Sequence, residues 1–173
     1  MIFKEWRDHY PDTAKRLKMS FIEGFYSVGT ATTSLAVLWW FLPFWLAVSL
    51  VSIVIVHELG HYFTATALGE HVNMPFFLPI FYFVVGGTHV RGDNPVSGIK
   101  IASAGPIAGS VWAAVIAIAA LIVGFMPAVW AALWLGLFQT YSGTLGSDGR
   151  KRRRFKRAID EFKAGAASAS VPA

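Results

Sequence analysis

Apolar residues dominate two long stretches of the chain, 24–69 and 101–147, and almost no charged residue interrupts them. Each stretch has a turn signal near its middle, at 42–43 in the first and at 124–127 in the second. A helix needs about 20 mainly apolar residues to cross a bilayer, so each stretch has room for two crossings. The pattern predicts four membrane-spanning helices, at 25–41, 44–68, 101–123 and 128–141.

The segment between these stretches, residues 69–98, has a different pattern. Its aromatic and aliphatic residues are interrupted by Pro75, Pro79, Gly86 and Gly87. A spanning helix does not accommodate so many interruptions, whereas strands joined by turns or a re-entrant loop do. The fold class expected is therefore an all-α polytopic membrane protein, with a membrane-associated β-hairpin or re-entrant loop between the second and third spans.

The two ends of the chain are polar. Residues 1–24 carry both charges and predict an amphipathic helix on the membrane surface, whereas residues 150–173 form a basic tail. Lysine and arginine gather at both ends and are absent from the two turns, and cytoplasmic segments are rich in these residues. We therefore expect a multi-pass protein of the cell membrane, with a core at 25–149 and both termini in the cytoplasm.

The run of basic residues at 150–154 is compatible with two kinds of anionic partner, nucleic acid and lipid. Basic clusters next to a spanning helix usually set the topology or contact anionic lipids. We therefore expect this tail to contact the anionic lipids of the bilayer and not nucleic acid.

The composition agrees with a membrane protein. Hydrophobic residues make up 55% of the 173 residues and charged residues 14%, whereas a soluble domain has about a quarter of its residues charged. These shares exclude a soluble globular domain and a disordered chain. The chain has no cysteine, which excludes thiol catalysis and cysteine-ligated metal sites.

The one formal charge inside the first apolar stretch belongs to the motif His57-Glu58-Leu59-Gly60-His61. Residues four apart share a face of a helix, so both imidazoles can bind one metal ion while Glu58 takes a proton from water on that metal. Polar residues deep in a membrane are costly and are functional by default. The motif predicts a zinc site; a structural polar cluster between helices is the alternative.

Catalytic zinc usually has three protein ligands and one open position, so a third ligand is needed. The candidates in the sequence are Asp148, His71, His89, Glu70 and Asp93. Asp148 is favoured because the fourth predicted span brings it to the same side of the membrane as the histidines. However, the sequence at 146–149, Gly-Ser-Asp-Gly, is an equally good turn after a helix.

Further motifs accompany the zinc motif in a definite order. A Pro- and Gly-rich segment ending in a Gly-Gly pair follows it, then Ala-Gly-Pro-Ile-Ala-Gly at 104–109, then Asp-Gly after the last span. Over about residues 44–150 this order resembles the site-2 protease family of intramembrane metalloproteases, in a minimal form without PDZ or CBS domains. The resemblance implies one Zn²⁺ per chain held by His57, His61 and Asp148, with Glu58 as the general base.

The resemblance also implies where a substrate binds. A hairpin at 76–90 would pair with an extended substrate, which gives Gly86 and Gly87 a role in substrate binding. The family commonly has an asparagine eight residues before the ligand aspartate, thought to assist substrate binding. This chain has Thr140 at that position, so Gln139 or Thr140 is expected to take over the role.

The expected function is hydrolysis of peptide bonds in or near the transmembrane segment of a single-span membrane-protein substrate. The altered sequence at 140–147 and the small size of the chain favour one alternative from another class. In that alternative the chain is a catalytically silent membrane scaffold or assembly subunit that keeps the protease fold. Metal binding and cleavage distinguish the two.

Overall fold

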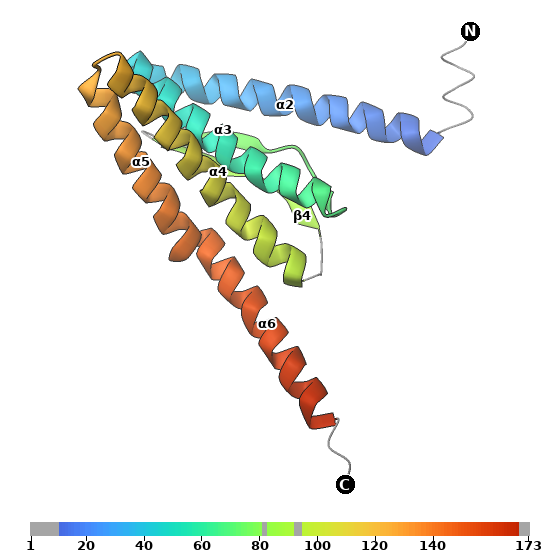
Figure 1. Ribbon diagram of the computed structural model, residues 1–173. Helices are drawn as coiled ribbons and strands as arrows, with labels where there is room; N and C mark the ends of the chain where they lie inside the picture. The colour runs from blue at the N-terminus through green and yellow to red at the C-terminus, as the bar shows by residue number, and fades with distance from the viewer. Residues whose placement is uncertain (1–10, 81–82, 92–94, 170–173) are drawn as a thin grey trace.

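The computed structural model describes residues 11–80, 83–91 and 95–169, and the chain is mostly helical over these residues (Figure 1). The elements in chain order are α2 (Pro11–Phe41), α3 (Phe44–Ala67), β1 (His71–Val72), β2 (Phe76–Ile80), β3 (Phe83–Gly87), β4 (Val90–Arg91), α4 (Pro95–Ile122), α5 (Met126–Thr144) and α6 (Ser147–Ala169). Helices supply the framework, and the short strands lie between α3 and α4 in the sequence.

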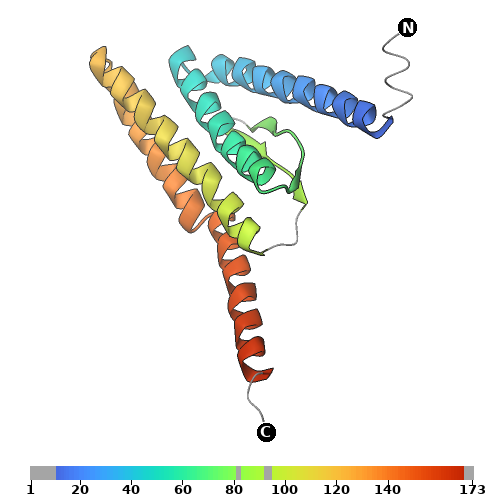
Figure 2. The ribbon, with the colours of Figure 1, turned by 45° about the vertical axis from the view of Figure 1, so that its right-hand side comes forward.

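Helix α4 packs against α3 on one side and α5 on the other (Figures 1 and 2). Glycines let these helices approach closely. A Cβ atom at Gly60 of α3 would lie 2.8 Å from the carbonyl oxygen of Ala104, and one at Gly143 of α5 would lie 2.7 Å from the Cβ of Pro106. Small residues at helix contacts are typical of membrane proteins. Because Gly60 belongs to the zinc motif, this packing fixes α3 against α4 at the level of that motif.

The strands form an antiparallel hairpin, which confirms the hairpin predicted between the second and third apolar helices. Strand β2 pairs with β3, with Phe77 opposite Gly86, and β1 pairs with β4. The hairpin contacts α2 on one side, where the Phe77 N–H donates to Thr30 Oγ1 at 3.2 Å. On the other side it contacts α3, where the Thr88 hydroxyl hydrogen-bonds Glu58. The hairpin therefore connects α2 to the helix that carries the zinc motif.

Helix α2 is continuous from Pro11 to Phe41 and extends away from the other helices toward the N-terminus (Figure 1). It crosses residue 24, where the sequence analysis placed the end of a separate surface segment. The physical reason is that no proline lies between Pro11 and Pro43, so nothing in the sequence stops the helix. Its last turns join a small buried cluster with α3, made of Leu38, Ala47 and Val51.

Helices α3, α4 and α5 correspond to the predicted spans at 44–68, 101–123 and 128–141. Helix α4 begins earlier than predicted, at Pro95, because proline is well suited to the first position of a helix. Among the described helices, α3 with 24 residues and α4 with 28 are long and apolar enough to cross a membrane. By the same criterion of length and hydropathy, α2 and α5 are not candidate spans, so the four-span topology stays a prediction.

Candidate metal centre

His57, Glu58 and His61 lie on adjacent turns of α3 and are all buried, with exposed fractions of 8%, 6% and 8%. Helix α4 crosses at this level. A Cβ atom at Gly105 would collide with the imidazole ring of His61. The glycine in the Ala-Gly-Pro-Ile-Ala-Gly segment therefore makes the room that His61 needs.

Asp148 reaches these residues from the far end of the chain. Helix α5 ends at Thr144, and α6 begins at Ser147, so Asp148 lies in the first turn of α6. The corner between the helices is tight, since a Cβ atom at Gly149 would overlap the backbone of Thr144. An acidic side chain in a first helical turn is also favoured by the helix dipole. The sequence at 146–149 thus separates α5 from α6, and Asp148 lies buried beside the histidines at this break.

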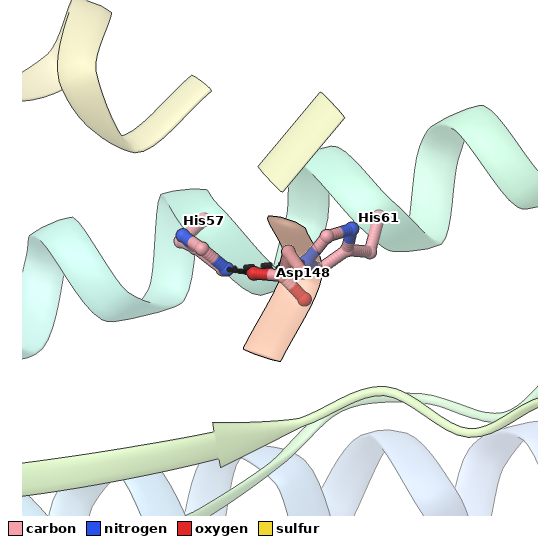
Figure 3. Close-up of side chains that lie close together, drawn as sticks. All are labelled: His57, His61 and Asp148. Atoms are coloured by element: carbon pink, nitrogen blue, oxygen red, sulfur yellow. Dashed lines mark hydrogen bonds and ion pairs between the residues drawn. The ribbon is translucent and has the colours of Figure 1, made fainter. Parts of the chain in front are cut away.

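His57, His61 and Asp148 each direct one potential metal-ligand atom toward the other two, and we call these three the donor atoms (Figure 3). His57 Nε2 and His61 Nε2 lie 3.1 Å apart, and Asp148 Oδ2 lies 3.3 Å from the first and 3.7 Å from the second. Ligands placed about 2.0–2.1 Å from zinc at tetrahedral angles are separated from one another by about 3.4 Å. The triangle of donors therefore has the dimensions of three corners of a zinc tetrahedron. Within the part of the chain that the structure describes, no second group of this kind is found.

The other nitrogen of each imidazole faces a hydrogen-bond acceptor. His57 Nδ1 donates to Gln139 Oε1 of α5 at 2.5 Å, and His61 Nδ1 donates to the carbonyl oxygen of Ile101 in α4 at 2.6 Å. An acceptor at Nδ1 places the proton there and leaves the lone pair of Nε2 for a metal. The donor set and its surroundings therefore fit a metal ion such as zinc.

The side chain of Asp148, the third potential ligand, is a carboxylate at neutral pH. Burial by itself would raise the pKa of Asp148, but hydrogen bonds with the imidazoles of His57 and His61, which Nε2 can donate when no metal is bound, outweigh burial and hold that pKa well below its usual range. The hydroxyl of Ser142 also donates to Asp148 Oδ2, at 3.2 Å. Metal ligands must be deprotonated, and Asp148 meets this requirement.

Glu58 lies next to the donor triangle and is held by the hairpin. The Thr88 hydroxyl donates to Glu58 Oε2 at 2.6 Å. Gly86 gives the carboxylate its space, because a Cβ atom there would lie 2.8 Å from Oε1 and 2.9 Å from Cδ of Glu58. One carboxylate oxygen is thus fixed, while no described residue hydrogen-bonds the other, Oε1.

The residues predicted to bind substrate lie in different surroundings. Gln139 is buried and bonded to His57, whereas Thr140 is exposed and its hydroxyl donates to the Gly136 carbonyl of its own helix. Gly86 and Gly87 end β3, and a Cβ atom at Gly87 would collide with the ring of Phe76. The roles of these residues toward a substrate stay predictions.

The other candidates for a third ligand differ from Asp148 in their placement. His89 is exposed between β3 and β4, and Glu70 is half-buried just beyond α3. Asp93 and the side chain of His71 lie outside the described residues. Of the described candidates, the structure brings Asp148 to the two histidines.

Sequence reasoning missed three groups that touch the site: the hydroxyls of Thr88 and Ser142 and the carbonyl of Ile101. Ser142 is six residues before Asp148 and Thr88 directly follows the Gly-Gly pair, so proximity to those motifs was an available signal. The Ile101 carbonyl had no signal, because every residue has a backbone carbonyl.

Comparison with known proteins gives one partial similarity. A stretch of 58 residues is 41% identical to part of a protein of Arabidopsis thaliana described as "Probable zinc metalloprotease EGY2, chloroplastic". The match covers 31% of this chain and 10% of that protein, so the chain spans only a small part of the relative's length. No family model matches the chain, and no solved structure matches it. The similarity and the group formed by His57, His61 and Asp148 together fit a metal-dependent enzyme.

Proposed function

We propose that this protein is an intramembrane zinc metalloprotease of the site-2 protease type. It would hydrolyse peptide bonds in or near the transmembrane segments of membrane-protein substrates. The observation that carries the proposal is the buried triangle of His57 Nε2, His61 Nε2 and Asp148 Oδ2, with ligand-like spacing and Glu58 beside it. The partial similarity to a zinc metalloprotease supports the same chemistry.

Two features support a location inside the membrane. The helix that carries the histidines, α3, is long and apolar enough to cross a bilayer, as is α4. Large apolar side chains are exposed along α4 and α5, and soluble proteins rarely expose so many together. Those exposed on the two helices include Ile107, Val111, Ile118, Ile122, Trp130, Trp134, Leu137 and Phe138. A lipid environment would cover them.

In this proposal His57, His61 and Asp148 hold the zinc ion. When bound, zinc supplies Lewis acidity, which polarises a carbonyl group and lowers the pKa of a coordinated water to about 7. Glu58 accepts a proton from the attacking water at Oε1, the oxygen that no described residue hydrogen-bonds, while Thr88 holds Oε2. Glu58 then gives the proton to the leaving amine.

The outer edge of β3 supplies a place for an extended substrate. The Phe77 N–H points away from β3 to Thr30, and residues opposite each other in an antiparallel pair point the same way relative to the ladder. The N–H and C=O groups of Gly86 therefore point away from β2, and no described residue bonds them. A substrate strand that pairs with this edge would form hydrogen bonds to its backbone N–H and C=O groups, which the membrane interior does not provide.

Comparative membrane proteomics tests this function in the native cell. Cells with the wild-type chain are compared with cells that carry Glu58→Gln. A single-span membrane protein that accumulates as the full-length form in the variant, and appears as a shorter product in the wild type, is the expected result.

The silent-scaffold alternative gives a different outcome. If the purified chain holds no zinc, no membrane protein changes length between the two strains, and the chain copurifies in a complex of fixed stoichiometry, the protease proposal is wrong.

Loss of the Gln139 side-chain acceptor should weaken zinc binding. Gln139→Leu keeps the size of the side chain but leaves His57 Nδ1 without its acceptor, so the ring is free to rotate away from the metal. We expect zinc affinity of the purified chain to fall about 10- to 100-fold. Gln139→Glu retains an acceptor at the same place and is expected to keep affinity near that of the wild type.

The exposed neighbour Thr140 provides the control, because Thr140→Val changes a side chain that does not touch the site. Equal zinc affinity of Gln139→Leu and Thr140→Val in a competition titration with a chelator would show that Gln139 does not orient His57.

Loss of the Thr88 hydroxyl should lower turnover without loss of metal. Thr88→Val has the same shape but cannot donate to Glu58 Oε2, which lets the carboxylate move away from the attacking water. We expect kcat for the substrate found by proteomics to fall about tenfold, since small misplacements of reacting groups are costly, while KM and zinc content stay unchanged. Thr88→Ser restores the hydroxyl and should restore kcat. A Thr88→Ser variant as slow as Thr88→Val would count against this role.

A further inference from the structure

Helix α6 carries a line of arginines that have no acidic partner within the described part of the chain. Arg150, Arg153, Arg154 and Arg157 follow the spacing i, i+3, i+4, i+7, so they share one face of the helix. With Ala158 and Glu161 they line one open hollow of about 470 Å³. Among the described residues, no carboxylate lies within ion-pair distance of these arginines.

Apart from Arg153, the arginine face is turned away from the rest of the protein. The opposite side of α6 packs on α4: Phe155 and Ile159 are half-buried, and a Cβ atom at Gly98 of α4 would lie 2.6 Å from the Phe155 ring. All four arginines are exposed. Beyond this contact α6 extends away from the helices in nearly the direction of α5 (Figures 1 and 2).

The arginine face begins where the apolar surface of α5 ends. The Arg153 guanidinium donates to the carbonyl oxygen of Thr144, the last residue of α5. Exposed Phe138 and Tyr141 precede this point along the chain, and exposed Leu145 directly follows it. In the proposed membrane location the arginines therefore stand at the level of the lipid headgroups, next to apolar side chains at the level of the acyl chains.

We propose that this face of α6 is a binding site for the phosphate headgroups of anionic phospholipids in the membrane that the protein occupies. Guanidinium groups form paired hydrogen bonds with phosphate, and several of them in one line can hold a headgroup that lysines would only attract. An acidic protein or a nucleic acid would also meet the charge, but neither would explain why the arginines start at the end of an exposed apolar surface. The inference rests on the membrane location given under the proposed function.

The test uses the full chain reconstituted in phosphatidylcholine vesicles that contain a trace of spin-labelled phosphatidylglycerol or spin-labelled phosphatidylcholine. The fraction of motionally restricted label gives the relative association of each lipid with the protein. We expect phosphatidylglycerol to associate at least about threefold more strongly than phosphatidylcholine, and less so at high salt.

Two triple variants with the same change in charge separate the arginine face from simple net charge. Arg150→Gln, Arg154→Gln and Arg157→Gln together should abolish the preference, and Arg153 is kept because it bonds the end of α5. Lys151→Gln, Arg152→Gln and Lys156→Gln together remove three charges from the other faces of α6 and should leave the preference intact. Equal loss in both triple variants overturns the proposal.

Two other results of the vesicle experiments would also contradict the proposed lipid site or the membrane location on which it rests. Tight binding of polyglutamate or single-stranded DNA to the same three arginines, in vesicles where phosphatidylglycerol shows no preference, assigns the face to another partner and overturns the proposal. If the chain fails to insert into vesicles at all, the membrane location itself is wrong. That failure is distinct from insertion without lipid preference.

Discussion

A purified Glu58→Gln chain is expected to hold one zinc ion and to lose hydrolysis of its substrate by a factor of about 10³, within the range that general-base catalysis supplies. The amide has the size of the carboxylate but cannot accept the proton of the attacking water. The metal should be retained, because Glu58 is not one of the three facing donors. Zinc per chain, measured by mass spectrometry, and product formed from the substrate identified by proteomics are the two measurements.

The matched control is Glu70→Gln, the same change at a half-buried glutamate that lies just beyond α3. It should keep both zinc and activity. Full activity of Glu58→Gln would remove the general base from the mechanism. Loss of zinc in Glu58→Gln would instead show that Glu58 helps to hold the metal.

Replacement of Asp148, the third proposed ligand, should differ from Glu58→Gln in its effect on the metal, because here the zinc itself should be lost. Asp148→Asn keeps the shape of the side chain, but a neutral amide is a poor ligand and two imidazoles alone bind zinc weakly. We expect zinc affinity to fall by more than about 100-fold, beyond the effect of losing an outer partner, and activity to fall with it. Affinity is measured by chelator competition on the purified chain.

Asp160→Asn provides a control on the same helix, at an exposed position. It should bind zinc as the wild type does. Stoichiometric zinc and normal turnover in Asp148→Asn would show that the third ligand lies elsewhere, and His71 and Asp93 would then be the next residues to replace.

The helices and the hairpin could be predicted because their signals are local. Pro43 and Gly124 divide the two apolar stretches and stop or turn a helix, so α3, α4 and α5 fall near their expected bounds. Prolines and glycines at 75–87 favoured strands over a helix, and β2 and β3 form there. The continuity of α2 was harder to predict, because a change from polar to apolar residues alters what surrounds a helix without ending it.

The candidate site was predictable only in part. The four-residue spacing of His57 and His61 places both on one face of a helix whatever surrounds it. The contacts of Gln139 with His57 and of Thr88 with Glu58 depend on how α5 and the hairpin cross α3. The spacing of residues within one helix or strand does not predict such a crossing. Glutamines and threonines are also common in helices and loops without such a role, so their presence alone carried little information.

The corner at Leu145 and Gly146 has a consequence for the timing of activity. In the proposed site the third ligand is contributed by α6, whereas the first two belong to α3, which is made earlier. A nascent chain that ends before α6 therefore has two donors only and no complete metal site. Its peptidase chemistry would begin only after α6 has been made and Asp148 lies beside the two histidines.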